Sequence, residues 1–381
     1  MKLWGILLTL PCLVLAQPEF FGYFESEADV MQLGSKQYNY GYHKFRLDIE
    51  ARPNDYVQIG ANINVQHYWG KTTWNIFDFI PGYADSGMEM NYQLPDTMVL
   101  DNVFMKLSFP LLDLTVGRQQ ISPGVGYAWN PTDIFNHKTL MDPSYEQSGV
   151  SGIRVEIPLP ANTNMTTFFQ PYDEWSSSSK QLWLSSGLGH FDIELTAAEY
   201  LWDYFNLSSI HKQKRTLLGL SLVGEVAGIG TWIEAAQNES DRPTNFGGNT
   251  ISWIEVTAGV DYTFENSIYV LGEFLHNELG VAQEADLTLS SYLYSLEGIT
   301  HSLMQDYGFF YIMHPTYDYV SLSALAIANF NDNSGTLAPQ LDWNAFEDTN
   351  ISLQTSFSWG DKDTEFGLQD WGLRLRLRSD F

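Results

Sequence analysis

This sequence has almost no cysteine and no long apolar run, and about a third of the chain has no basic residue. Its 381 residues include a single cysteine, Cys12, and no run of 18 apolar residues, so a transmembrane helix is not expected. Between Pro243 and Asp361 there are fifteen Asp and Glu but no Lys or Arg, and the net charge of the chain is −27. This balance argues against nucleic acid or an anionic membrane surface as a partner, since both attract Lys and Arg.

The first residues predict a secretory signal peptide over residues 1–16, followed by one domain over residues 17–381. Lys2 gives a basic start, and the apolar stretch that follows is too short to span a bilayer. An N-terminal membrane anchor is the weaker alternative. A lipoprotein modified at Cys12 is also weak, because Pro11 precedes Cys12 after only a short apolar run. Cleavage after Ala16 would leave no thiol or disulfide chemistry in the exported chain.

The last eleven residues have the clearest strand pattern. One parity holds Trp371, Leu373, Leu375 and Leu377, and the other holds Gly372, Arg374, Arg376, Arg378 and Asp380. Because side chains alternate along a strand, one face is apolar and the other is charged. In a transmembrane barrel these faces meet lipid and a water-filled lumen, whereas in a soluble sandwich the charged face meets bulk water. The terminal Phe381 resembles the C-terminal signature of bacterial outer-membrane barrels, which implies recognition by the barrel-assembly machinery.

Turn signals divide the chain into about eighteen strands. Gly, Pro, Asn or Asp mark eight tight reversals, at residues 52–55, 110–111, 158–164, 187–190, 227–230, 264–266, 314–316 and 346–350. Longer loops alternate with them, near residues 28–38, 70–97, 119–149, 173–179, 203–212, 239–249, 279–303, 329–335 and 359–370. This alternation predicts an all-β, antiparallel up-and-down transmembrane barrel with short periplasmic turns. A count of sixteen strands remains compatible with the same signals. The aromatic content of 15% suits interfacial girdles, although it would also suit a carbohydrate-binding sandwich.

The polar faces of the strands are expected to point into a wet lumen, since Arg or Lys facing lipid costs roughly 2–4 kcal/mol at the midplane. In a closed barrel the last strand lies beside the first strands, which predicts a basic wall opposite an acidic wall and a field that orients dipolar solutes. Pairing of Arg154 with Glu156, or of Arg46 with Glu50, is the purely structural alternative. The residues expected to line the pore and set its selectivity are Lys44, Arg46, Lys106, Arg118, Asp133, Arg154, Glu194, Glu225, Glu255, Asp261, Glu273, Arg374, Arg376 and Arg378.

The loop at residues 119–149 is the most distinctive segment. It follows Gly117-Arg118-Gln119, includes Trp129-Asn130-Pro131-Thr132-Asp133, and is rich in Gly and aromatics. Such a loop needs a place to bury its apolar side chains, and the lumen provides one. Here the chain resembles outer-membrane porins, whose third external loop often folds inward and narrows the channel. It also resembles uncharacterised porin-like barrels and, loosely, the alginate-export type of eighteen-stranded barrel. The acidic excess departs from that last type, since a polyanion conduit should be basic. A plug without a selectivity role is the alternative for this loop.

Signatures of catalysis and metal binding are missing from the sequence. The eight histidines show no zinc spacing, and there is no Gly-x-Ser-x-Gly motif or phosphate-binding loop. We therefore expect no enzyme activity, no cofactor and no metal site, although a barrel hydrolase could assemble a triad from separate strands. The hypothesis is a Gram-negative outer-membrane channel for small hydrophilic solutes. It would contact lipid and lipopolysaccharide, and a homotrimer stays open because lipid-facing and subunit-facing positions look alike. The leading alternative is a non-conducting adhesin, scaffold or plugged receptor.

Overall fold

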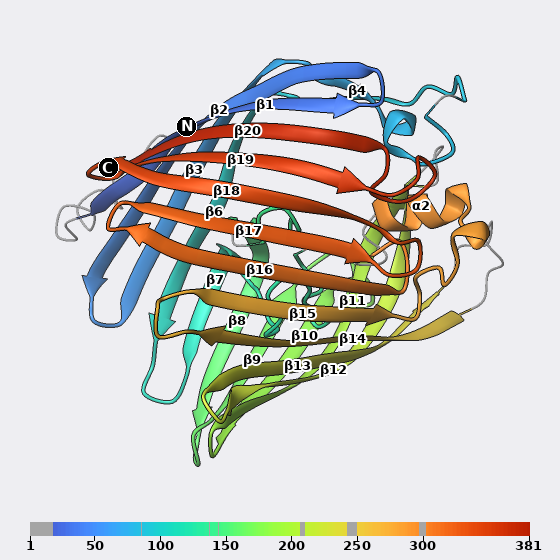
Figure 1. Cartoon of the computed structure of the whole chain (residues 1–381). Helices are drawn as coiled ribbons and strands as arrows, with labels where there is room; N and C mark the ends of the chain where they lie inside the picture. The colour runs from blue at the N-terminus through green and yellow to red at the C-terminus, as the bar shows by residue number, and fades with distance from the viewer. Residues whose placement is uncertain are drawn as a thin grey trace, which may run out of the picture.

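The computed structural model describes residues 18–84, 86–136, 138–143, 145–205, 210–241, 250–296 and 302–381. Eighteen antiparallel strands form one sheet that closes where β1 (Glu19–Leu33) pairs with β20 (Gln369–Asp380) (Figure 1). Next to this seam, the backbones of Gly22 and Phe381 exchange two hydrogen bonds of 3.1 and 2.9 Å. The predicted fold class and the count of eighteen are thus confirmed. The expected signal peptide lies outside the described residues.

The other barrel strands are β2 (Lys36–Asn54), β3 (Val57–Gly70), β6 (Thr97–Ser108), β7 (Asp113–Gln119), β8 (Val150–Leu159), β9 (Thr163–Gln170), β10 (Ser179–Leu188), β11 (Phe191–Phe205), β12 (Ile210–Val226), β13 (Ile229–Asp241), β14 (Thr250–Thr263), β15 (Tyr269–Asn277), β16 (Asp306–Tyr317), β17 (Val320–Asn329), β18 (Ser334–Phe346) and β19 (Thr349–Trp359). The loops contain a β4–β5 ribbon (Thr73–Asn75, Asn91–Gln93), η1 (Ile76–Phe79), η3 (Glu284–Asp286) and α2 (Leu289–Leu296). No helix in the described ranges is both long and apolar enough to cross a membrane.

Short turns gather at the end of the barrel that holds both termini, and α2 and the longer loops gather at the other end (Figure 1). Two expected connections were wrong. The loop expected at residues 28–38 is a tight turn at Gly34, whose φ of 57° suits glycine, so β1 and β2 are longer than predicted. The turn expected at residues 314–316 lies after Tyr317 instead, because β16 accommodates Pro315 with a bulge close to its end.

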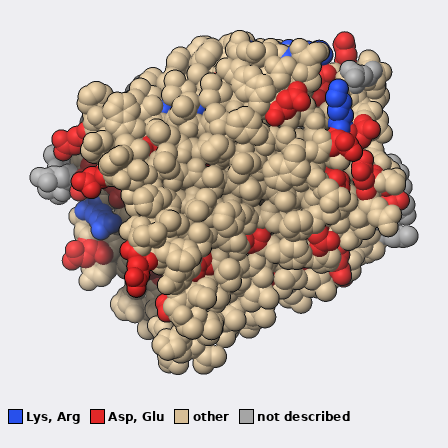
Figure 2. All heavy atoms as spheres, viewed as in Figure 1, with Lys and Arg blue, Asp and Glu red and all other residues tan. Residues whose placement is uncertain are grey.

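The outward face of the barrel is apolar. Leu195, Leu218, Val260 and Phe310 are about half or more exposed, each on the parity opposite to the buried residues of its strand. One outer face is a broad uncharged surface, with most charged residues toward its two ends (Figure 2). Exposed aromatics lie near the ends of the strands, as a girdle requires: Tyr56, Tyr317 and Phe346 near the short turns, Tyr92, Trp175 and Phe330 at the loop end.

Loops fill part of the barrel interior with apolar side chains. Phe77 of η1, Trp129 of the 120–149 loop and Tyr292 of α2 pack in one buried cluster with strand residues such as Leu275 and Ile327. These loops cover the inner face of β15 to β18. The solvated part of the lumen is therefore narrower than the strand count alone would suggest.

Candidate functional site

The 120–149 segment between β7 and β8, called loop 3 below, lies inside the barrel and is held by two carboxylates. Glu234 of β13 accepts backbone hydrogen bonds from Val125 (2.7 Å), Gly126 (3.3 Å) and Thr132 (2.7 Å). It also accepts one from the Thr132 hydroxyl at 2.7 Å. Its side chain is fully buried, so these four donors replace its hydration.

Glu273 of β15 holds the next part of the loop in the same manner. Its two oxygens accept the backbone N–H groups of Tyr127 (2.6 Å), Ala128 (2.9 Å) and Trp129 (2.9 Å). The indole Nε1 of Trp232 donates a further bond of 2.7 Å. Charge-assisted hydrogen bonds of this kind are roughly twice as strong as neutral ones. Glu234 and Glu273 therefore fix the backbone of loop 3 against the β13–β15 wall.

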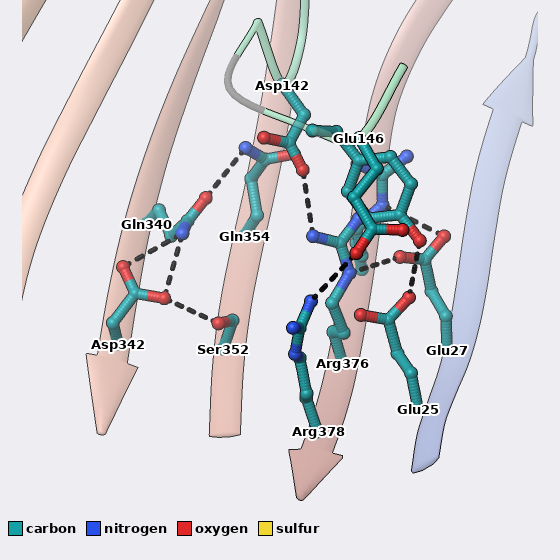
Figure 3. A network of polar contacts seen from close by, with 12 residues as sticks. Glu25, Glu27, Asp142, Glu146, Gln340, Asp342, Ser352, Gln354, Arg376 and Arg378 are labelled. Atoms are coloured by element: carbon teal, nitrogen blue, oxygen red, sulfur yellow. Dashed lines mark hydrogen bonds and ion pairs between the residues drawn. The ribbon is translucent and has the colours of Figure 1, made fainter. Parts of the chain in front are cut away.

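The later part of loop 3 reaches the opposite wall, formed by β1, β2 and β20 (Figure 3). Glu146 lies 3.0 Å from the Lys44 ammonium and 2.8 Å from the Arg46 guanidinium, and it accepts a 2.7 Å hydrogen bond from the Tyr23 hydroxyl. Asp142 lies 2.8 Å from Arg376. Since β13 stands almost diametrically across the ring from β1, loop 3 spans the lumen.

The arginine ladder faces an acidic ladder. Arg374, Arg376 and Arg378 point inward as predicted, and β1 places Asp29, Glu27 and Glu25 directly opposite them in the ladder. Arg376 lies 2.7 Å from Glu27, and Arg374 lies 3.1 Å from Asp29. The expected uniformly basic wall was therefore wrong. Charge pairing between neighbouring strands, the purely structural alternative, describes this geometry better.

The environment of Glu146 keeps it ionised. Burial raises the pKa of this loop carboxyl, but the hydrogen bond from Tyr23 and the charges of Lys44 and Arg46 outweigh that effect, so its pKa lies below the usual value. A second loop carboxyl, Glu365, has the opposite balance. Burial raises the pKa of Glu365 to about 7, because its hydrogen-bonding neighbours are uncharged.

Two predicted selectivity residues are placed elsewhere than expected. Arg118 is the penultimate residue of β7 and lies opposite Val103, on the outward parity, and its Nε donates to the Asp101 carbonyl at 2.8 Å. Asp133 is 1% exposed and accepts the backbone N–H groups of Phe135 and Asn136, each at 3.0 Å. Arg118 therefore supports the strand end, and Asp133 stabilises a turn within loop 3. Neither faces the solvated lumen.

The remaining predicted residues lie on inward parities, and, within the described residues, all but Glu225 have partners. Lys106 is 2.8 Å from Asp113, and Arg154 is 3.5 Å from Glu156. Glu194 accepts a 3.4 Å bond from Thr196, and Asp261 accepts a 2.9 Å bond from Tyr269. Glu255 is fully buried, 3.3 Å from Arg215 and 2.7 Å from the Trp253 indole, so it belongs to the wall. Glu225 lies exposed at the short-turn rim.

Sequence reasoning missed the acids that complete the site, namely Glu25, Glu27, Asp29, Asp142 and Glu146. For the first three a signal existed, because Tyr23, Glu25, Glu27 and Asp29 share one parity of the first strand. That strand was expected to end at about residue 27, and the face was not recognised. Asp142 and Glu146 lie in an irregular loop, where no periodicity points to an orientation.

Comparisons with known proteins identify the fold. No protein-family model matches the chain, and no curated protein matches it. Several solved structures do, at 96% coverage of this chain in each case. OccK3 (OpdO) of Pseudomonas aeruginosa has a TM-score of 0.58 at 9% identity and is covered over 96% of its length. OccAB3 of Acinetobacter baumannii has 0.56 at 11%, covered over 99%, and OccK2 (OpdF) of P. aeruginosa, solved with glucuronate, has 0.55 at 10%, covered over 98%.

Proposed function

We propose that this protein is an outer-membrane channel that passes small hydrophilic solutes through a lumen narrowed by loop 3. The observation that carries the proposal is the course of loop 3 across the barrel. Its backbone is fixed to Glu234 and Glu273 on one wall, and its side chains pair with Lys44, Arg46 and Arg376 on the other. A loop held at both sides of a charged lumen forms an ordered constriction.

The two faces of the barrel support placement in a membrane. Its outward face is apolar with aromatics toward both strand ends, and its inward face carries charges and amides, as in barrels that span the outer membrane. The similar solved structures are outer-membrane porins of the Occ type, which agrees with this placement. Export by a cleaved signal peptide over residues 1–16 belongs to the same proposal.

Among the expected selectivity residues, we assign the role to the inward charges that loop 3 leaves partly solvated. Arg46, Arg374, Arg376 and Arg378 line one side together with the acids of β1, whereas Lys44 is buried against Glu146. Lys106 and Arg154 lie further along the same inner surface. Glu234, Glu255 and Glu273 are occupied by the loop or the wall and act on its structure instead.

A plugged, non-conducting barrel is the second candidate, and one observation favours it. The apolar cluster around Phe77, Trp129 and Tyr292 joins three loops inside the barrel. Refolded protein in a planar bilayer separates the two. Discrete current steps at constant voltage support the channel, whereas a folded barrel that inserts without conducting supports the plugged form.

A further inference from the structure

The β19–β20 loop, residues 360–368, folds into the mouth of the barrel at the end that carries the long loops. Phe366 packs against the interior apolar cluster that contains Trp129 and Tyr292, which places the loop next to α2 (Figure 1). Phe366 also lines a cavity of about 270 Å³ together with Met141 of loop 3 and inward-facing residues of β18 and β19. The β19–β20 loop therefore covers part of the lumen.

The side chain of Glu365 holds this loop to the neighbouring strands. Its Oε2 accepts hydrogen bonds from the Tyr307 hydroxyl of β16 and, at 2.8 Å, from the Asn329 amide of β17. The Tyr307 hydroxyl in turn accepts the Met304 backbone N–H at 2.9 Å, just before β16 begins. The Glu365 backbone N–H donates at 2.8 Å to Asp332 in the β17–β18 turn. Displacing Glu365 would therefore release the loop from β16, β17 and this turn together.

The groups around Glu365 disfavour its charged form. Its titratable neighbours are Tyr307, Asp332 of the β17–β18 turn and Tyr292 of α2, and none of them is a cation. The elements that supply them lie between Pro243 and Asp361, a stretch without Lys or Arg. A carboxyl group with uncharged donors and a second carboxylate beside it retains its proton to higher pH. The pKa of Glu365 is accordingly raised to about 7, mainly by burial.

Ionisation of Glu365 should therefore loosen the docked loop. The pKa of Glu365 in the docked loop lies above the ordinary carboxyl value, so docking is strongest below that ordinary value. The favourable contribution then disappears as the pH rises through 7. For a single proton with this pKa, the equilibrium constant for docking falls about tenfold between pH 6 and pH 8.

We propose that the β19–β20 loop is a pH-operated lid over the mouth of the lumen, docked while Glu365 carries a proton and lifted when Glu365 is ionised. The proposal rests on the proposed channel function and adds a means of regulating it. Lifting the loop would uncover the cavity beside loop 3 and widen the opening. Loop 3 itself would stay in place, because Glu234 and Glu273 hold its backbone.

Single-channel conductance of the refolded protein at pH 6 and pH 8 tests the lid. Wild type should conduct more at pH 8, because the loop is lifted in a larger fraction of barrels. Glu365→Gln keeps the shape of the side chain but cannot ionise, so its conductance should stay at the wild-type pH 6 level at both pH values. Asp363→Asn is the matched control. It neutralises an exposed carboxylate of the same loop and should preserve the wild-type response.

Thiol labelling measures the position of the loop independently of current. The only natural cysteine, Cys12, lies in the expected signal peptide, so Thr364→Cys would give the exported chain a single thiol next to Glu365. Thr364 is 2% exposed, and a membrane-impermeant maleimide should reach this position only when the loop lifts. The reference is the same cysteine in a Glu365→Gln background at the same pH, which cancels the titration of the thiol. Relative to it, labelling should be about tenfold faster at pH 8 than at pH 6.

A relative labelling rate that does not change between pH 6 and pH 8 would overturn the lid. So would a conducting wild type with equal conductance at both pH values, or a conductance change that persists in Glu365→Gln. Should Glu365→Gln fail to fold, judged by heat-modifiable gel mobility, Asp332→Asn carries the test. It removes the carboxylate beside Glu365, so the midpoint of Thr364→Cys labelling should move to lower pH, and an unchanged midpoint would contradict the proposal. A barrel that shows the labelling change without conducting counts against the channel function and not against the docking of the loop.

Discussion

The two walls of the barrel hold loop 3 by different means. On the β13–β15 wall, Glu234 and Glu273 are 0% and 4% exposed and bind backbone N–H groups. On the β1–β2–β20 wall, the Glu146 side chain is 28% exposed and pairs with Lys44 and Arg46. Buried carboxylate–amide contacts are directional and poorly screened, whereas partly solvated ion pairs weaken with salt. The first wall therefore sets the position of the loop, and the second sets the charge around the opening.

The largest expected effect comes from removing a carboxylate that holds loop 3 on the β13–β15 wall. Glu273→Ala would leave three backbone N–H groups and the Trp232 indole without their acceptor, at a cost of about 3 kcal/mol or more to loop docking. We expect the loop to leave the wall and single-channel conductance to rise. Glu194→Ala is the control, because that inward carboxylate accepts a long 3.4 Å bond from Thr196 and, within the described residues, none from loop 3. Equal conductance in both variants would mean that Glu273 does not position a constriction.

A smaller effect is expected when the arginine ladder is shortened. Arg374→Ala combined with Arg376→Ala removes two inward cations and uncovers Glu27 and Asp29, with a structural cost of about 3 kcal/mol for the broken, partly buried pairs. The reversal potential in a salt gradient should shift toward cation selectivity.

The matched control for the ladder removes two cations from the other face. Lys180 and Lys214 both pair with Glu199, on the outward parity of β10 and β12. Their double replacement by alanine should leave the reversal potential where it is. A shift of equal size in both double variants would show that overall charge, rather than the lumen, determines selectivity.

The sequence predicted part of the β1–β2–β20 wall, but it did not predict how the β13–β15 wall holds loop 3. Alternation along the last strand correctly placed Arg374, Arg376 and Arg378 inward, because parity is a local property. The role of Glu273 as a loop anchor could not be read from its strand, since its partners lie 144 to 146 residues away in loop 3. The same distance in sequence hides the contact of Glu146 with Lys44, 102 residues apart.

The wrong predictions for Arg118 and for the turn at Gly34 have the same physical cause. Arg118 was expected in the pore, yet it is still within β7, where parity turns it outward. The turn at Gly34 was read as a long loop because polar residues around it resemble loop composition, although they belong to paired strands. Register and loop docking depend on residues far apart in the chain, and a pattern within one segment does not specify them.

Glu146→Gln tests the role of the β1–β2–β20 wall, and its expected effect on the reversal potential is modest. The substitution keeps the shape but removes the charge facing Lys44 and Arg46, and a partly exposed pair of this kind contributes about 1 kcal/mol. Conductance should stay near that of wild type because Glu234 and Glu273 still hold the loop, while the reversal potential shifts toward anions. A rise in conductance comparable to that of Glu273→Ala would show that the charged wall also positions the loop.

Lowering the pH should weaken the contact of loop 3 with the β1–β2–β20 wall only far below neutral pH. Because the pKa of Glu146 is lowered by its cations, its contribution to loop docking is complete above the ordinary carboxyl pKa and disappears as the pH falls through the depressed value. The protection factors of the loop 3 amides, which correct for the intrinsic pH dependence of exchange, should therefore be unchanged between pH 7 and pH 5. Lower protection at pH 5, absent in Glu146→Gln, would contradict the assignment.

The smallest expected effect concerns Glu365, whose loop lies between β19 and β20. Its pKa is raised to about 7, so the favourable contribution of the protonated form is present at low pH and is lost as the pH rises through 7. The protection factors of residues 360–368, which correct for the intrinsic pH dependence of exchange, should be lower at pH 8 than at pH 6. Glu365→Gln should abolish this pH dependence, and a persistent difference in the variant would assign it to another group.

Constriction of the lumen by loop 3 is best tested by the single-channel current of the refolded protein in a planar bilayer, recorded for wild type and Glu273→Ala. We expect steady wild-type conductance and a higher conductance in the variant, because loop 3 crosses and narrows the lumen. Folded wild-type barrels that carry no current, or a variant with the same conductance as wild type, would contradict it.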